Sequence, residues 1–226
     1  MKRILSIVVA VLPLFAVAST GVSKNELGLT VYTEEVATPA SAIDQIESML
    51  ASEVRDDAGD SISGINEIVN LGEKIWKLIE KNKPVLNTKN AYANAVPRGV
   101  KSPEELENFT PMQYKSFRKY AKNQFGGIAF DLTYVLAHRY NGQLKGAGRF
   151  LDAVTVLPHK VDVLWGYTVN FGVTRVSTAN LGSEKEAIGA VVMELDFNVS
   201  TILKASQYKN LYEFRGDSAR VTSIEN

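Results

Sequence analysis

The feature that most constrains the fold is a two-residue alternation of apolar and polar side chains that begins after Gly127. A period of two places every second side chain on the same face of a β-strand. The first such run is Ile128–Arg139, and later runs are Val161–Phe171 and Val191–Ser200. The connections between these runs are short and have no helical period, so the sequence predicts an antiparallel β-sandwich over residues 111–217.

A two-residue hairpin is expected at Asn141–Gly142, because Asn and Gly accept the positive φ angles that such a turn requires. A turn at this pair would place His138 opposite Lys145, and Tyr134 opposite Arg149. We therefore expect these four side chains to form a candidate interaction surface. The glycines that follow the turn are typical of a bulge, which would shift the register beyond them.

The alternation in Val161–Phe171 predicts a single strand whose inward side carries Trp165 and Tyr167. A run of large apolar residues with a period of two is typical of a buried core. We therefore expect Trp165 to be buried, so that its replacement by alanine would cost about 3–5 kcal/mol. His159 precedes this strand and is expected to be exposed in a turn.

The N-terminal part of the chain has helical periodicity instead. The apolar spacing predicts one helix over residues 41–54, capped by Ser41, and a wider apolar stripe predicts a second helix over residues 62–79. With both amphipathic helices, within residues 40–84, packed on the C-terminal β-sandwich, the expected fold class is α+β. Residues 19–39 are expected to form an irregular lead-in, residues 85–110 a connection, and residues 218–226 a C-terminal tail.

The segment Thr110–Asn123 is compatible with either a helix or a strand. Its aromatic residues are spaced by three, which favours a helix, whereas the glycines and strands after it favour a strand. The segment also contains a basic run, which we interpret as a solvated face; its members are Lys115, Arg118, Lys119 and Lys122. The formal net charge of the chain is zero at pH 7, so we expect no nucleic-acid partner.

The first 18 residues have the organisation of a signal peptide. Lys2 and Arg3 form a basic region, Ile4–Val17 is apolar, and Ala16–Val17–Ala18 offers a small-residue cleavage site. We therefore expect an exported protein that begins near Ser19 and is located in the periplasm or outside the cell. The chain contains no cysteine, and an exported domain without disulfides favours a bacterial source.

The sequence lacks the residue patterns of the common catalytic and metal sites. It has two histidines, no cysteine and no Gly-x-Ser-x-Gly motif, so we expect no metal, no cofactor and no enzymatic activity. One alternative stays open, because Glu194 and Asp196 share one face of a strand. Paired carboxylates act as acid and base in glycosidases, and a carboxylate-based hydrolase is therefore the third interpretation of this chain.

The first interpretation is an exported, non-enzymatic binding or structural protein whose partner is a protein, a glycan or a component of the cell envelope. The second is a membrane-active protein that inserts the helix of residues 62–79 through Ile65, Val69, Trp76 and Ile79. Membrane contact through this helix is not favoured, since so wide an apolar stripe is normally covered by the rest of the protein. We therefore expect Trp76 to stay packed when lipid is added.

Overall fold

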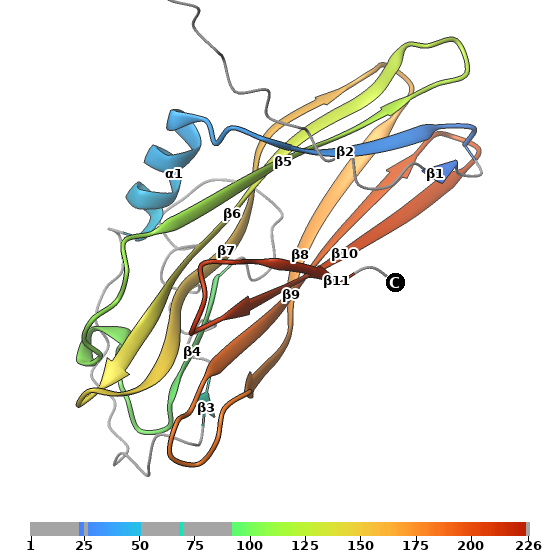
Figure 1. The fold of residues 1–226 in the computed structure, drawn as a ribbon. Helices are drawn as coiled ribbons and strands as arrows, with labels where there is room; N and C mark the ends of the chain where they lie inside the picture. Colours follow the sequence, from blue (N-terminus) through green and yellow to red (C-terminus); the bar gives the residue numbers. More distant parts are fainter. Residues whose placement is uncertain (1–22, 25–26, 51–67, 70–91, 225–226) are drawn as a thin grey trace, which may run out of the picture.

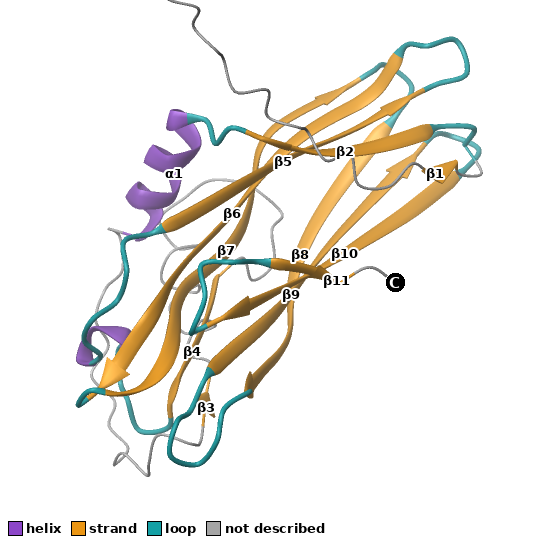
Figure 2. Ribbon diagram, in the orientation of Figure 1, coloured by secondary structure: helices purple, strands orange, loops and turns teal. Residues whose placement is uncertain are grey.

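The computed structural model consists of two antiparallel β-sheets that face each other, with one α-helix on the outside (Figures 1 and 2). The structure describes residues 23–24, 27–50, 68–69 and 92–224. The prediction of antiparallel sheets is confirmed. Of the two N-terminal helices that made the expected class α+β, only the first is present in the described residues.

The larger sheet has seven strands in the order β1-β2-β5-β6-β7-β4-β3. Their bounds are β1 Ser23–Lys24, β2 Thr30–Val36, β3 Ile68–Val69, β4 Tyr92–Pro97, β5 Gln113–Lys122, β6 Ile128–Leu144 and β7 Ala147–Val163. The ambiguous segment before Asn123 is therefore a strand. Four of the seven strands lie before residue 111, so the sheet extends well outside the predicted sandwich of residues 111–217.

The smaller sheet has four strands in the order β11-β10-β9-β8. Their bounds are β8 Thr168–Asn180, β9 Gly189–Ser200, β10 Ala205–Arg215 and β11 Thr222–Ile224, so the predicted tail contributes an edge strand. The alternation predicted for β9 is confirmed, because Val191, Met193, Leu195, Phe197 and Val199 are all buried.

The main core lies between the two sheets. Leu132, Tyr134 and Leu136 of β6 contribute from the larger sheet, and Leu195 of β9 with Tyr212 of β10 contribute from the smaller one. The hydroxyl oxygens of Tyr134 and Tyr212 are 2.6 Å apart, so each buried hydroxyl has a hydrogen-bond partner. Burial of each large apolar side chain contributes about 1.5–3 kcal/mol, which is how a chain without cysteine can hold two sheets together.

Helix α1, Ala40–Leu50, covers part of the outer face of the larger sheet (Figure 2). Ala42 and Ile46 are buried against that sheet, with Leu157 of β7 among their neighbours. The predicted cap, Ser41, instead lies in the first helical turn, with its Oγ 3.3 Å from Nε2 of His159. A 3-10 helix, η1 (Pro103–Glu105), lies in the connection before β5.

The second predicted helix, over residues 62–79, falls almost entirely outside the described residues, and so do Ile65, Trp76 and Ile79. The two described residues of this segment form β3, in which Val69 pairs with Val96 of β4. At these two positions the helix prediction is therefore wrong.

The register predicted for the β6–β7 hairpin is wrong. The turn lies at Lys145–Gly146, whose φ angles of 52° and 76° are both positive, as a type I′ turn requires. Asn141 also has a positive φ of 66°, but it lies within β6, where its N–H donates to the carbonyl oxygen of Gly216 at 2.8 Å. A Cβ on Gly142 would lie 2.3 Å from the ring of Phe109, so this glycine serves packing rather than a turn.

The predicted burial of Trp165 is also wrong, because its side chain is 95% exposed. β7 runs without a turn through His159, which is half-buried, and ends at Val163. A β-turn then follows, closed by a hydrogen bond of 3.1 Å from the N–H of Tyr167 to the carbonyl oxygen of Leu164. Gly166 supplies the positive φ of 89° that this turn needs. The alternation thus spans two strands of different sheets and the turn between them.

Candidate functional site

Three turns at one end of the molecule carry large, exposed apolar side chains. We call this region the hairpin end and define it by residues 122–128 of the β5–β6 turn, 160–168 of the β7–β8 turn and 200–205 of the β9–β10 turn. The exposed fractions are 86% for Phe125, 95% for Trp165, 99% for Ile202 and 90% for Leu203. Fully exposed side chains of this size are uncommon, and their concentration in three turns indicates an interaction surface.

The strand pairing brings these turns together. The N–H of Leu164 donates to the carbonyl oxygen of Ala129 at 2.9 Å, which places the β7–β8 turn beside the β5–β6 turn. Thr168, the first residue of β8, pairs with Ser200, the last residue of β9, so the β9–β10 turn is also adjacent. Figure 1 shows the turns together at the upper right end of the two sheets.

The charged residues of the hairpin end are mostly basic. Lys122 and Lys204 are exposed, and Lys160 has a side chain that is 66% exposed. Asp162 is the one acidic residue in the three ranges, and it pairs with Lys160 at 2.8 Å. Within the three ranges that define the hairpin end there are thus three lysines and one aspartate.

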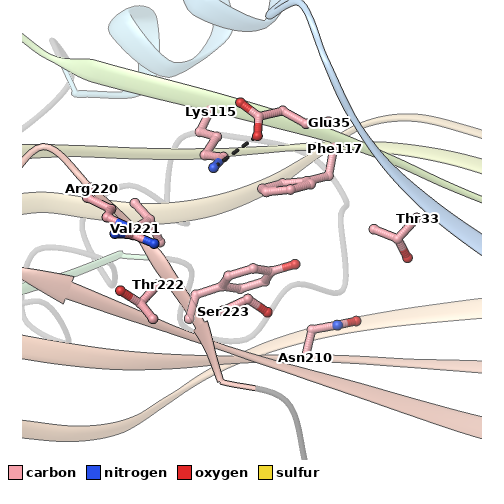
Figure 3. Close-up of a pocket in the computed structure, with 10 residues that line it drawn as sticks. Thr33, Glu35, Lys115, Phe117, Asn210, Arg220, Val221, Thr222 and Ser223 are labelled. Atoms are coloured by element: carbon pink, nitrogen blue, oxygen red, sulfur yellow. Dashed lines mark ion pairs between the residues drawn. The ribbon is translucent and has the colours of Figure 1, made fainter. Parts of the chain in front are cut away.

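A second candidate site is a cleft between the open edges of the two sheets (Figure 3). It encloses about 360 Å³, which is at the lower end of the range for small-molecule sites. The lining comes from β2, β5, β10, β11 and the segment that leads into β11. The lining residues are Thr33, Glu35, Lys115, Phe117, Asn210, Tyr212, Arg220, Val221, Thr222 and Ser223.

The floor of the cleft is aromatic and its mouth is charged. The ring of Phe117 stacks on Tyr134 and Tyr212, with centroid distances of 5.6 and 5.9 Å. Nζ of Lys115 lies 3.0 Å from Oε2 of Glu35 and 5.3 Å from the centroid of Phe117. Both members of this ion pair are partly exposed, so its contribution to stability is small.

Lys119 follows Phe117 by two residues on β5 and is hydrogen-bonded to Asn210, a residue that lines the cleft. Lys119 is 5% exposed, and its Nζ donates to Oδ1 of Asn210 at 2.5 Å. The same Nζ is 4.8 Å from the ring centroid of Phe197 and 5.6 Å from that of Tyr208. Within the described part of the chain no carboxylate pairs with Lys119, and burial lowers its pKa to about 8. The prediction that Lys119 belongs to a solvated face is therefore wrong.

The predicted interaction surface does not assemble. Tyr134 and His138 are buried between the sheets at 0% and 1% exposure, whereas Lys145 is exposed in the β6–β7 turn and Arg149 is half-buried on β7. His138 packs edge to face on Phe214 with centroids 5.3 Å apart, and burial lowers its pKa to about 4. His138 is therefore neutral at pH 7 and belongs to the core.

The two carboxylates considered for hydrolysis lie on the outer face of β9, away from the cleft. Glu194 pairs with Lys209 at 2.8 Å, and Oδ2 of Asp196 accepts a hydrogen bond from Gln207 at 2.8 Å. Each carboxylate is thus held by a neighbour on β10, as is typical of the solvated face of an antiparallel sheet.

Searches against protein-family models, curated proteins and solved structures give no match to this chain. Among the described residues no helix is long and apolar enough to cross a bilayer. In that same part of the chain no three His, Asp or Glu side chains come together in a way that could hold a metal ion. The geometry of the hairpin end and of the cleft therefore carries the functional argument.

Sequence reasoning missed both sites. A weak signal for the hairpin end is Ile202–Leu203, an apolar pair in a short connection between two predicted strands, where polar residues are usual. The signal for Lys119 is its position between Phe117 and Ala121, which share its face of β5 and are apolar. Neither signal shows which residues lie opposite Ile202–Leu203 or Lys119, because only the packing of the two sheets determines these neighbours.

Proposed function

We propose that the protein is an exported, non-enzymatic envelope protein that binds the surface of a lipid bilayer through its hairpin end. The observation that carries this proposal is the almost complete exposure of Phe125, Trp165, Ile202 and Leu203 in three adjacent turns. Tryptophan is enriched at membrane–water interfaces, where its ring lies among the lipid headgroups. Transfer of apolar side chains from water to the headgroup boundary supplies the attraction.

The shape of the hairpin end favours lipid over a protein partner. A protein interface needs a continuous patch with a complementary surface, whereas a bilayer accepts separate side chains that project from different turns. Here the four exposed side chains belong to three separate turns. Phe125 and Trp165 each lie in a turn of their own, and Ile202 and Leu203 are neighbours in the third. A protein partner would have to provide a separate pocket for each turn.

The charge of the hairpin end favours an anionic bilayer. Each basic residue near an anionic surface contributes about 1 kcal/mol of attraction, which salt screens. The three ranges contain Lys122, Lys160 and Lys204 but one acidic residue, Asp162, and both Lys122 and Lys204 are exposed. Export, expected from the basic and apolar N-terminal residues, would give the mature protein access to an envelope membrane.

Sedimentation with lipid vesicles tests this proposal. The wild-type protein should sediment with vesicles of phosphatidylcholine and phosphatidylglycerol, and less with vesicles of phosphatidylcholine alone. A variant with Trp165→Ser, Ile202→Ser and Leu203→Ser should lose at least nine-tenths of this binding while its unfolding midpoint stays unchanged, because all three side chains are exposed.

The matched control replaces two exposed apolar residues outside the hairpin end, Val176→Ser and Leu181→Ser, which are 54% and 44% exposed. The control variant should bind vesicles like the wild type. Equal binding by the wild type and the triple variant would contradict the proposal. So would a wild-type protein that ignores vesicles but forms dimers that the triple substitution abolishes, since this result would assign the tips to a protein interface.

A further inference from the structure

The cleft between the open sheet edges has a composition that the proposed membrane contact does not explain. It opens between β2 and β5 on one side and β10 and β11 on the other, whereas the apolar tips lie at the ends of the strands (Figures 1 and 3). The cleft and the hairpin end are therefore separate sites, and substitutions at one leave the other in place.

Positive charge dominates the cleft and its immediate surroundings. Lys115 and Arg220 line the cleft, and Lys119 adjoins it through the hydrogen bond of its ammonium group to Asn210. Glu35 is the one carboxylate among the lining residues, and it pairs with Lys115. Figure 3 shows Lys115 pointing into the space between the sheets, and Arg220 on the segment that leads into β11. Of these four charged groups in the described residues, three are cationic and one is anionic.

The buried ammonium group of Lys119 is the strongest indication of what the cleft accepts. A buried charge is costly unless it is paired, and the amide oxygen of Asn210 satisfies only one of the three donors of Lys119. The rings of Phe197 and Tyr208 add attraction but no negative charge. An anion in the cleft would supply the missing charge at short range.

The polar groups of the lining fit such an anion. Hydroxyls are provided by Thr33 of β2 and by Thr222 and Ser223 of β11, and they can donate hydrogen bonds to oxygen atoms. Arg220 is exposed, and its planar guanidinium suits two-point contact with a carboxylate or phosphate. The pair between Lys115 and Glu35 is exposed enough to open, which would release the Lys115 ammonium for a ligand.

We propose that this cleft is a binding site for a small oxyanion, a carboxylate or a phosphate, held by Lys115 and Arg220 with Lys119 adjoining through Asn210. The aromatic floor formed by Phe117 and Tyr212 leaves room for a flat or apolar body attached to the anionic group. Its volume of about 360 Å³ limits the ligand to a small molecule.

Nuclear magnetic resonance titration with two probes, sodium phosphate and sodium succinate, tests this site at constant ionic strength maintained with sodium chloride. We expect saturable shifts of the backbone amides of β5, β10 and β11 with at least one of the probes. The probe that binds more tightly identifies the preferred oxyanion. Arg220→Gln, at an exposed position, should weaken binding at least ten-fold, and Lys119→Met should do the same.

The matched control is Lys209→Met, which removes a lysine from the outer face of the smaller sheet, where it pairs with Glu194. This variant should bind both probes like the wild type. The proposal is overturned if the shifts do not saturate with either probe. It is overturned as well if the shifted amides lie beside exposed lysines over the whole surface and not around the cleft. It is also overturned if Arg220→Gln binds as tightly as the wild type, a result that does not depend on the stability of the Lys119 variant.

Discussion

The burial of Lys119 predicts a measurable dependence of stability on pH. In the folded protein the pKa of Lys119 is lowered from 10.5 to about 8, because burial disfavours the charged form. Each pKa unit corresponds to about 1.4 kcal/mol, so the charged ammonium destabilises the folded state by about 3 kcal/mol. This cost is fully present below about pH 8, decreases as the pH rises from about 8 to 10.5, and is absent above that range.

The Lys119→Met variant tests this estimate, since methionine keeps most of the aliphatic chain and removes the charge. The variant also loses the hydrogen bond to Asn210, which is worth about 1 kcal/mol. We therefore expect it to be more stable than the wild type by about 2 kcal/mol at pH 7, and less stable by about 1 kcal/mol at pH 10.5. Comparison of the two proteins at each pH cancels the titration of groups that they share.

Urea unfolding followed by far-ultraviolet circular dichroism at pH 7, 8, 9 and 10.5 measures the two free energies of unfolding. The difference between the proteins should change sign across this range. A variant that is less stable than the wild type at pH 7 would refute the reasoning, and so would a difference that stays constant with pH. Either result would mean that the ammonium group of Lys119 is hydrated or paired in the folded protein.

Two substitutions test the packing of β6. Gly142→Ala places a Cβ 2.3 Å from the ring of Phe109, so we expect a loss of about 1–3 kcal/mol in urea unfolding, and a simultaneous Phe109→Leu should restore part of it. Arg139→Met removes the ion-pair partner of the buried carboxylate of Asp152, and we expect a loss of about 3–5 kcal/mol. A loss below about 1 kcal/mol at pH 7, as is usual for an exposed ion pair, would contradict the role of the buried carboxylate.

The elements that were predicted correctly keep the same face buried along their whole length, so their apolar residues recur with one regular spacing. β9 alternates between the core and solvent from Val191 to Ser200, and α1 buries one side through Ala42 and Ile46. In both cases the pattern of side chains determines which face is covered, whatever lies opposite. The sequence alone is therefore sufficient to predict that these elements exist and whether each is a helix or a strand.

The predictions were wrong where contacts with distant residues decide between two structures that the local sequence allows equally. Asn141 and Lys145 both precede a glycine and both adopt a positive φ, but the ring of Phe109 over Gly142 and the carbonyl of Gly216 hold Asn141 within β6. The chain reverses at Lys145–Gly146 instead. No pattern within β6 and β7 contains this information, because the deciding groups lie more than 30 residues away.

The exposed tips illustrate a second cause. A two-residue turn preserves the alternation of the strands on either side of it, so the run from Val161 to Phe171 resembles one buried strand. Gly166 was the one residue in this run that indicated an interruption of the strand, since glycine within a strand often marks a bulge or a bend. Trp165, the large apolar residue beside that glycine, is exposed in the turn, where the proposed membrane contact would use it.

The most direct test of the proposed membrane contact is the fluorescence of Trp165. The chain has two tryptophans, so the Trp76→Phe variant leaves Trp165 as the only indole. With saturating vesicles of phosphatidylcholine and phosphatidylglycerol, its emission should shift to the blue, and lipids brominated near the headgroup should quench it more strongly than lipids brominated near the bilayer centre. The reciprocal Trp165→Phe variant should show no change in Trp76. An unchanged emission of Trp165 at saturating lipid would contradict the account.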